Sequence, residues 1–179
     1  ATLIALGACG STDPADPADE AAGDTSPATT TLSPAGAGAG CSEPPVVPSA
    51  RGTSAPLDPP TETLSGTWTG QIHTNCGDIE VELFGDKAPD TVTSFRHLAE
   101  AGYWADSPCH RLTTQGIFVL QCGDPTGTGR GAPGYTFGIE NAPADGKYPP
   151  GTLAMARAQD PNSNGGQFFI VYEDTELPV

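Results

Sequence analysis

Every aromatic side chain of this sequence lies in its second part, and this decides where a hydrophobic core can form. All twelve aromatic residues and all three histidines occur at or after Trp68. Residues 1–65 have neither, and they hold ten of the nineteen prolines together with seven glycines. A segment so poor in large apolar side chains cannot bury enough surface to offset the entropy of ordering its backbone. We therefore predict a disordered tether rich in Pro, Ala, Gly and Asp over residues 10–65, and one folded domain over residues 66–179.

The first nine residues, A-T-L-I-A-L-G-A-C, form a short apolar run that ends in small residues before Cys9. Its end, L-G-A-C, resembles a bacterial lipobox, in which a signal peptidase cuts before a cysteine whose thiol then carries lipid. We interpret residues 1–9 as a signal peptide remnant with its lipobox, and expect an extracytoplasmic protein that lipid on Cys9 anchors to the cell membrane. The alternative is an ordinary signal peptide or a clipped membrane anchor.

Acidic residues outnumber basic ones along the whole chain, which has a net charge of −15. Residues 1–65 contribute −7, from eight acids and one arginine, and residues 66–179 contribute −8, from fourteen acids and six lysines and arginines. The sequence has no basic patch, so we do not expect it to bind nucleic acid.

The five cysteines are consistent with an exported protein. No C-x-x-C pair or histidine-spaced cluster is present, so no metal site is predicted. Beyond Cys9, Cys41 lies in the tether, and Cys76, Cys109 and Cys122 lie in the folded part. Cys109 and Cys122 flank a predicted hairpin and either pair with each other or stay buried as free thiols. The sequence alone leaves the pairing undecided.

Polar and apolar residues alternate over residues 78–84, which predicts a half-buried strand, and residues 67–74 read as the other arm of a hairpin. A helix follows, with Val92, Phe95 and Leu98 on one face. Further strands are predicted later in the chain, without the alternation of strands and helices that a parallel sheet requires. We therefore expect a mainly antiparallel sheet or barrel. The later strands fall at both ends of 109–124 and within 153–158 and 167–172.

Several familiar catalytic motifs are absent. The glycine-rich run 127–131 lacks the Gly-Lys-Ser/Thr ending of a phosphate-binding loop, and no helix is predicted after it. No serine stands in a G-x-S-x-G motif, and the acids are scattered among turns and strand faces. The sequence thus predicts neither a cofactor nor a nucleophilic triad.

Three stretches, taken in order, are more informative than any one of them alone. They are H-R followed by I-F-V-L-Q-C-G-D, then G-T-L-A-M-A-R-A, then N-G-G-Q-F-F-I. Over residues 66–179 the sequence resembles the cyclophilin family of peptidyl-prolyl isomerases, and the form H-R-L-T-T-Q-G-I-F-V resembles an actinobacterial-type branch. The resemblance implies a closed antiparallel β-barrel with a capping helix. It also implies an enzyme that rotates X-Pro bonds without a cofactor.

The same resemblance implies a set of site residues. Arg111 would be the catalytic hydrogen-bond donor, and Gln121 would hold either Arg111 or the peptide backbone. The proline pocket would be lined by Phe118, Val119, Phe169 and Leu177. The residues that precede the proline would be bound by Ala156, Arg157 and Gln167. Arginine suits the first role because it stays charged and offers several donors on a planar head.

The sequence departs from the family pattern at two places. Leu177 stands where many members have a pocket tryptophan, which we expect to weaken binding of cyclosporin-type ligands. The sequence ends at Val179 without counterparts of the family's final strands, so we expect a barrel that is incomplete at its C-terminus. The expected partners are proline-containing peptides and folding proteins, and the expected state is a monomer. The alternative function is a binding module or chaperone-like envelope protein that holds proline segments without turnover.

Overall fold

A computed structural model of the chain describes residues 40–44 and 56–178. Cys9, the predicted lipobox and most of the predicted tether lie outside the described residues. Within the described part, no helix is both long enough and apolar enough to cross a membrane.

A long antiparallel hairpin forms where the sequence predicts one. Its arms are β1 (Thr67–Thr74) and β2 (Gly77–Phe84). The turn ends at Gly77, whose φ of 119° is readily adopted only by glycine. Along β2, half-buried residues such as Leu83 alternate with exposed acids such as Glu82, so one face of the hairpin is turned toward the core.

The helix α1 (Pro89–Glu100) buries the face that its sequence spacing predicts. The side chains of Val92, Phe95 and Leu98 are 4%, 8% and 0% exposed. At the N-terminus of α1, the carboxylate of Glu140 accepts hydrogen bonds from the backbone N–H groups of Asp90, at 3.2 Å, and Thr91, at 2.7 Å. An acid there satisfies donors that the helix itself leaves unpaired.

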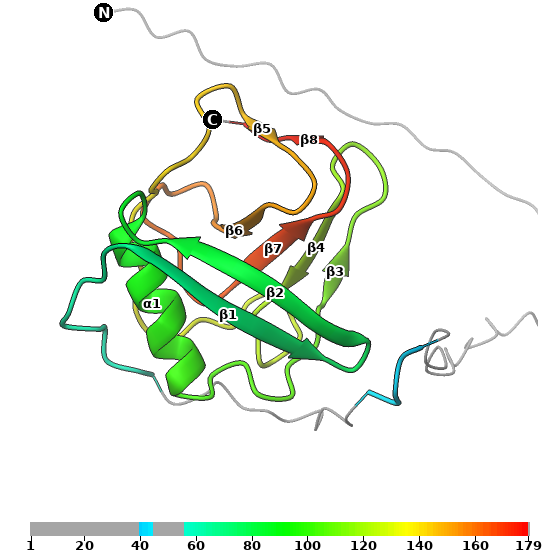
Figure 1. The fold of residues 1–179 in the computed structure, drawn as a ribbon, viewed down its shortest axis with the longest axis horizontal. Helices are drawn as coiled ribbons and strands as arrows, with labels where there is room; N and C mark the ends of the chain where they lie inside the picture. Colours follow the sequence, from blue (N-terminus) through cyan, green and yellow to red (C-terminus); the bar gives the residue numbers. More distant parts are fainter. Residues whose placement is uncertain (1–39, 45–55, 179) are drawn as a thin grey trace, which may run out of the picture. The chain divides into compact units, whose positions relative to one another are not determined.

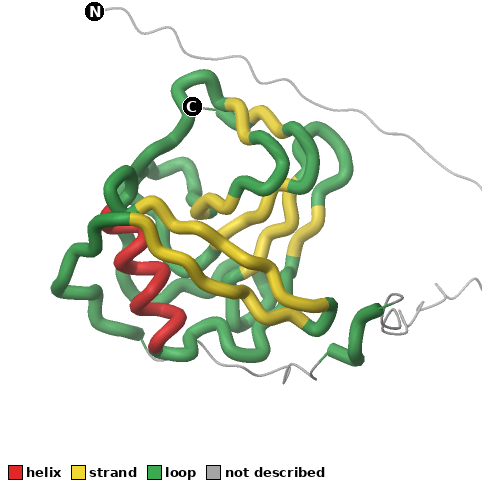
Figure 2. Tube along the Cα trace, viewed as in Figure 1, coloured by secondary structure: helices red, strands yellow, loops and turns green. Residues whose placement is uncertain are grey.

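Six shorter strands make up the rest of the β structure. They are β3 (Arg111–Leu112), β4 (Val119–Cys122), β5 (Lys147–Tyr148), β6 (Leu153–Met155), β7 (Phe168–Val171) and β8 (Thr175–Glu176). One sheet has the order β3-β4-β7-β6 with every neighbouring pair antiparallel, and a small sheet pairs β5 with β8 (Figure 1). The segment that joins β4 to β5 is drawn as loop throughout (Figure 2).

The four-stranded sheet has a different cluster of side chains on each face. On one face, Cys122 and Phe168 pack with Phe95 of α1 to form the main core. The hairpin residues Ile72 and Leu83 pack against this core as well. A second buried cluster, on the other face, consists of Val119, Phe169 and Val171. Neighbouring residues of a strand point to opposite faces, which is why Phe168 and Phe169 belong to different clusters.

Over the described residues, the structure confirms a mainly β fold with one helix. Hydrogen-bonded pairing among the described strands is limited to three separate sheets, so the closed barrel stays a prediction. The helix does cover one side of the core, since the Phe95 ring contacts Trp104 at 4.5 Å and Phe168 at 5.6 Å between ring centroids.

Ten residues before the predicted domain start are already attached to the domain. The backbone N–H of Leu57 donates to Pro133 O at 2.7 Å, and that of Leu64 donates to Thr93 Oγ1 at 2.7 Å. Composition did not reveal these contacts, because backbone groups make them rather than large apolar side chains. The described part of the domain therefore reaches back to residue 56.

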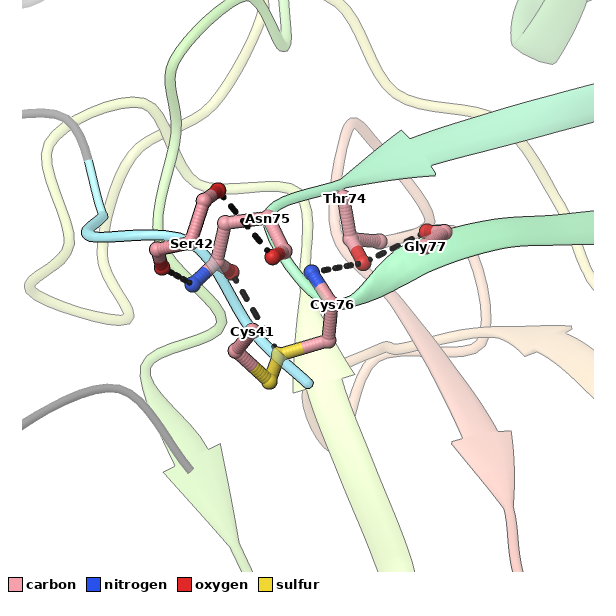
Figure 3. Close-up of a disulfide and its surroundings, with 6 residues drawn as sticks. All are labelled: Cys41, Ser42, Thr74, Asn75, Cys76 and Gly77. Carbon is pink, nitrogen blue, oxygen red and sulfur yellow. Dashed lines mark hydrogen bonds between the residues drawn. A yellow bond between two sulfur atoms is a disulfide. The ribbon is translucent and has the colours of Figure 1, made fainter. Parts of the chain in front are cut away.

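Two disulfides cross-link the described residues. Cys41 pairs with Cys76 at the tip of the β1–β2 hairpin, although the two lie 35 residues apart (Figure 3). Beside this bridge, the Ser42 N–H donates to Asn75 O at 2.7 Å and the Asn75 side-chain amide donates to Ser42 O at 2.8 Å. The second bridge joins Cys109 to Cys122, so the structure decides between the two states that the sequence leaves open.

Candidate active site

One row of residues crosses the four-stranded sheet from edge to edge. Arg111 on β3 lies opposite Gln121 on β4, Gln121 lies opposite Phe169 on β7, and Phe169 lies opposite Ala154 on β6. Residues directly opposite each other in antiparallel strands point to the same face. The sheet register therefore brings a cation, an amide and an aromatic ring together on the face away from α1.

A chain of hydrogen bonds holds the polar end of this row. Arg111 Nη1 donates to Gln121 Oε1 at 3.1 Å, and Gln121 Nε2 donates to Gln167 Oε1 at 2.9 Å. Gln167 Nε2 in turn donates to Gly131 O at 3.1 Å. We call these three bonds the amide relay. Each amide uses its oxygen on one side and its nitrogen on the other, so the relay fixes which way both glutamines face.

Arg111 itself is exposed, and its guanidinium makes one hydrogen bond to the described residues, the one to Gln121. Across residues 40–44 and 56–178, no carboxylate forms an ion pair with it. A guanidinium that one glutamine orients, and that no acid neutralises, can offer hydrogen bonds to a bound molecule.

The apolar end of the row is the second cluster. Val119 and Phe169 are 3% and 9% exposed, and Leu177 packs against this cluster. The sequence did not single out three further neighbours of this cluster, namely Ile117, Tyr148 and Ala154. Tyr148 comes from β5, with ring centroids 6.1 Å from Phe169, and only the three-dimensional fold brings it there.

Phe118 does not belong to this cluster. Its ring meets Tyr172, with centroids 6.0 Å apart. Its backbone N–H donates to Thr175 Oγ1 at 2.9 Å, and its carbonyl accepts the Tyr172 N–H at 3.1 Å. The structure thus places the predicted pocket residue Phe118 beside Tyr172, while its neighbour Ile117 packs on the cluster.

The segment after β6 forms another border of the site. The Ala156 N–H donates to the backbone carbonyl of Gln167 at 2.9 Å, and Ala156 packs on the second cluster. Arg157 is exposed, and its Nη1 donates to Ala158 O at 3.0 Å. With Tyr148, Arg157 lines a cavity of about 200 Å³. Burial raises the pKa of Tyr148, and the nearby Arg157 charge partly offsets that rise.

A buried carboxylate supports the other end of the relay. Asp124 is 0% exposed, and its oxygens accept Thr126 N–H at 2.8 Å, Thr126 Oγ1–H at 2.7 Å and Gly131 N–H at 3.1 Å. Burial raises the pKa of Asp124, but hydrogen bonds from Thr126 and Gly131 outweigh it and hold the value at about 2. Asp124 packs so closely on residue 131 that a Cβ there would collide with it, so Gly131 must be glycine.

The two cysteines of the Cys109–Cys122 disulfide lie on either side of Arg111 and Gln121 in the sequence. Cys109 precedes Arg111 by two residues and Cys122 directly follows Gln121. Between them, the His110 N–H donates to Gln121 O at 3.0 Å. The disulfide thus ties the short edge strand β3 to β4 where the relay begins.

Groups that could hold a metal ion are lacking among the described residues, where no three His, Cys, Asp or Glu side chains come together. The chemistry that this arrangement offers is a fixed hydrogen-bond donor at the edge of an apolar surface. Such a site can bind an apolar ring and stabilise an electron pair that becomes localised next to it.

Comparison with known proteins gives a consistent result. Residues 69–177 match the family model described as cyclophilin type peptidyl-prolyl cis-trans isomerase. The probable peptidyl-prolyl cis-trans isomerase B of Mycobacterium tuberculosis is 42% identical over 160 residues, covering 79% of this chain and 50% of that protein. The peptidyl-prolyl cis-trans isomerase A of the same organism is 42% identical over 135 residues, covering 68% and 73%. The chain thus spans about half the length of its isomerase B relatives.

A solved structure matches the fold as well. The crystal structure of a Cryptosporidium parvum cyclophilin type peptidyl-prolyl cis-trans isomerase, in the presence of the dipeptide Ala-Pro, aligns with a TM-score of 0.54 at 39% identity. The alignment covers 62% of this chain and 70% of that one.

Proposed function

Because this chain belongs to the cyclophilin-type peptidyl-prolyl cis-trans isomerase family, we propose that it accelerates the rotation of X-Pro bonds in exported proteins. Rotation about such a bond must cross a barrier of about 18–20 kcal/mol, because amide resonance is lost midway. In the twisted state the prolyl nitrogen holds a localised lone pair that can accept a hydrogen bond. No nucleophile, metal or cofactor is needed for this chemistry.

Each part of the site has a role in this mechanism. Arg111 donates a hydrogen bond to the prolyl nitrogen, and the amide relay through Gln121 and Gln167 keeps the guanidinium aimed. Val119, Phe169 and Leu177 receive the proline ring. A donor bond that is strongest in the twisted state lowers the barrier without tightening the ground-state complex.

One observation carries the proposal. The register of the sheet places Arg111, Gln121 and Phe169 in a single row, with 3.1 Å between Arg111 Nη1 and Gln121 Oε1. A polar donor and an apolar surface thereby lie side by side on one rigid sheet. The roles of Phe118, Ala156 and Arg157 in peptide binding belong to the same proposal.

The direct test is the rate of cis/trans exchange of an Ala-Pro peptide, measured by NMR with and without the chain. We expect faster exchange at catalytic protein concentrations. If the chain binds the peptide, as shown by chemical-shift changes, and leaves the exchange rate unaltered, then it is a proline-binding module and not an isomerase.

The finer features of the family extend the proposal. We propose that the three sheets curve into a closed barrel around the main core and that the protein acts as a monomer. Leu177 offers less ring surface than the tryptophan found in many members, so a cyclosporin-type ligand should bind weakly. Size-exclusion chromatography with light scattering tests the monomer, and a cyclosporin titration tests the ligand.

We also propose that lipid on Cys9 anchors the protein outside the cytoplasm. Two disulfides among the described residues support an oxidising compartment. In the full precursor, Cys9→Ser should release the protein from membranes or leave it unprocessed, because the thiol is the acyl acceptor. Unchanged processing and membrane retention of this variant would rule out the anchor.

A further inference from the structure

Gln167 is hydrogen-bonded, directly or through Gln121, to three segments that each carry an arginine, in a domain that is otherwise acidic. Its Oε1 accepts a hydrogen bond from Gln121, whose own side-chain oxygen accepts one from Arg111. Its Nε2 donates to the carbonyl of Gly131, the residue that follows Arg130. Its backbone carbonyl accepts the N–H of Ala156, next to Arg157. Three of the six lysines and arginines in residues 66–179 therefore flank one residue of the proposed site. We call Arg111, Arg130 and Arg157 the arginine set.

Two of the other three cations have side-chain contacts elsewhere, and the third lies opposite an acid in a strand pair. Arg96 on α1 pairs with Glu100 at 2.7 Å and lies 4.8 Å from the centroid of a Trp68 ring. Lys87 lies 5.0 Å over the Phe84 ring. Lys147 is opposite Glu176 in the β5–β8 pair.

The arginine set, by contrast, is not neutralised. All three arginines are exposed, and within 40–44 and 56–178 no ion pair involves any of them. The two acids closest along the chain to Arg130 and Arg157 accept hydrogen bonds from main-chain groups. Asp124 is buried and accepts several N–H and O–H groups, including the backbone N–H of Arg130 at 3.0 Å, and Asp160 Oδ1 accepts the Asn162 N–H at 2.8 Å.

We propose that Arg130 and Arg157 act with Arg111 to select proline segments that carry an acidic residue close to the proline. This inference rests on the proposed isomerase site and names the substrate class of that site. A carboxylate beside the proline would gain an exposed ion pair, and such pairs contribute about 0.2–1 kcal/mol each. That corresponds to a preference of up to about fivefold per arginine.

The net charge of the domain acts in the opposite direction. Fourteen acids against six basic residues repel an acidic peptide at long range. At about 0.1 M salt, charges farther apart than roughly 10 Å are largely screened, and local pairs persist. The preference should therefore be measured at that ionic strength.

The test uses peptides of the form acetyl-Ala-Xaa-Ala-Pro-Ala-amide, in which Xaa is Glu, Gln or Lys. Gln is the neutral match for Glu in size. For the full chain at about 0.1 M salt, we expect the Glu peptide to have a kcat/KM two- to fivefold above that of the Gln peptide, and the Lys peptide to fall below both. The ratio of the Glu to the Gln value is the readout, since any general loss of activity in a variant cancels from it.

Three variants then locate the preference. Arg157→Gln and Arg130→Gln should each lower the ratio toward one, and Arg157→Glu should favour the Lys peptide. Arg96→Gln removes the same charge from α1, on the other side of the sheet, and should leave the ratio unchanged. A wild-type ratio of one or less, or a ratio that responds equally to Arg96→Gln, overturns the inference.

Dissociation constants of the same peptides, from NMR titration, separate the two proposals. If exchange is not accelerated for any peptide, the isomerase proposal fails, and the ratio of dissociation constants still decides whether the arginine set selects acids. If the Gln peptide is accelerated and both ratios equal one, only the inference on charge selection fails.

Discussion

At the scale of single residues, the candidate site contains two glutamines, Gln121 and Gln167, whose side-chain amides each accept one hydrogen bond and donate another. Gln121 accepts from Arg111 and donates to Gln167, so it transmits the orientation of one amide to the guanidinium. A side chain of similar size without polar atoms would fill the same space and leave Arg111 free to turn. The consequence concerns the aim of the donor, not the stability of the sheet.

We therefore expect Gln121→Leu to lower kcat/KM for an Ala-Pro peptide by roughly two- to tenfold, since one hydrogen bond contributes about 0.5–1.5 kcal/mol. The loss should appear in kcat more than in KM, because the apolar cluster is untouched. Gln71→Leu, an exposed change on β1, is the control. Equal activities for the two variants would show that Gln121 does not position Arg111.

At the scale of single elements, the strand β7 contributes buried side chains to both faces of the four-stranded sheet. Phe168 is 4% exposed and packs in the main core with Phe95, whereas Phe169 belongs to the second cluster beside the amide relay. Adjacent residues of one strand thus belong to different faces of the sheet, although both are buried phenylalanines, and only Phe169 lies on the face of the proposed proline-binding site.

The same substitution, phenylalanine to leucine, at each of these two positions tests the assignment of the two faces. Phe168→Leu should lower the free energy of unfolding by about 1 kcal/mol with little effect on KM, because the loss of packing is confined to the core. Phe169→Leu should raise KM for the Ala-Pro peptide severalfold. Urea unfolding and kinetics on both variants test this, and a larger KM effect from Phe168→Leu would contradict the assignment of faces.

The loop that holds Gly131 is a second element, and the Asp124 carboxylate accepts several of its N–H groups. Asp124→Asn replaces an acceptor with an amide whose N–H₂ faces backbone donors, so it should cost roughly 2–3 kcal/mol. The pKa of Asp124 is lowered to about 2, so its stabilising contribution is fully present above its ordinary value of 3.8 and is lost as pH falls through about 2.

Urea unfolding at pH 7 and at pH 2.5 separates these effects. The wild type should lose more stability than Asp124→Asn over that interval, because the variant has no carboxylate to protonate. Identical losses of stability in both proteins would show that Asp124 is not held in its charged form.

At the scale of the whole molecule, two disulfides cross-link the described residues, and their surroundings differ. Cys41–Cys76 closes a long loop at the hairpin tip, and Cys109–Cys122 closes a short one around Arg111. Chain entropy assigns about 3–4 kcal/mol to each, as an upper range. Their effects on activity should differ, because only the second bridge borders the amide relay.

Accordingly, Cys109→Ser with Cys122→Ser should lower both the thermal midpoint and kcat. Cys41→Ser with Cys76→Ser should lower the midpoint and leave kcat/KM of the folded protein unchanged. Calorimetry and peptide exchange at 25 °C provide both numbers. Equal kcat values for the two double variants would argue against a role of the second bridge in holding β3.

Whether the sequence could predict a feature depends on how far apart in the sequence the interacting residues lie. The β1–β2 hairpin, the buried face of α1 and the opposite directions of Phe168 and Phe169 depend on local periodicity, so they were predictable. Contacts set by long-range packing were not. Tyr148 reaches the second cluster only through the β5–β8 pair, and the partner of Cys76 lies 35 residues away in a segment with no periodicity.

The resemblance places Phe118 in the proline pocket. In the structure its ring meets Tyr172 while Ile117 packs on the second cluster, so the pocket role of Phe118 stays a prediction. The mainly β fold is as the sequence predicts, and the roles of the predicted site residues stay predictions.

The central claim is that Arg111 lowers the rotational barrier from its place beside the apolar cluster. The measurement is the exchange rate of an Ala-Pro peptide with Arg111→Ala and with Arg111→Lys, after circular dichroism has shown both to be folded. We predict a loss of about 10²–10³ in kcat for alanine, as for other preorganised donors, and little recovery with lysine, whose ammonium cannot reproduce the planar fork. A folded Arg111→Ala variant that exchanges the peptide at the wild-type rate would contradict the account.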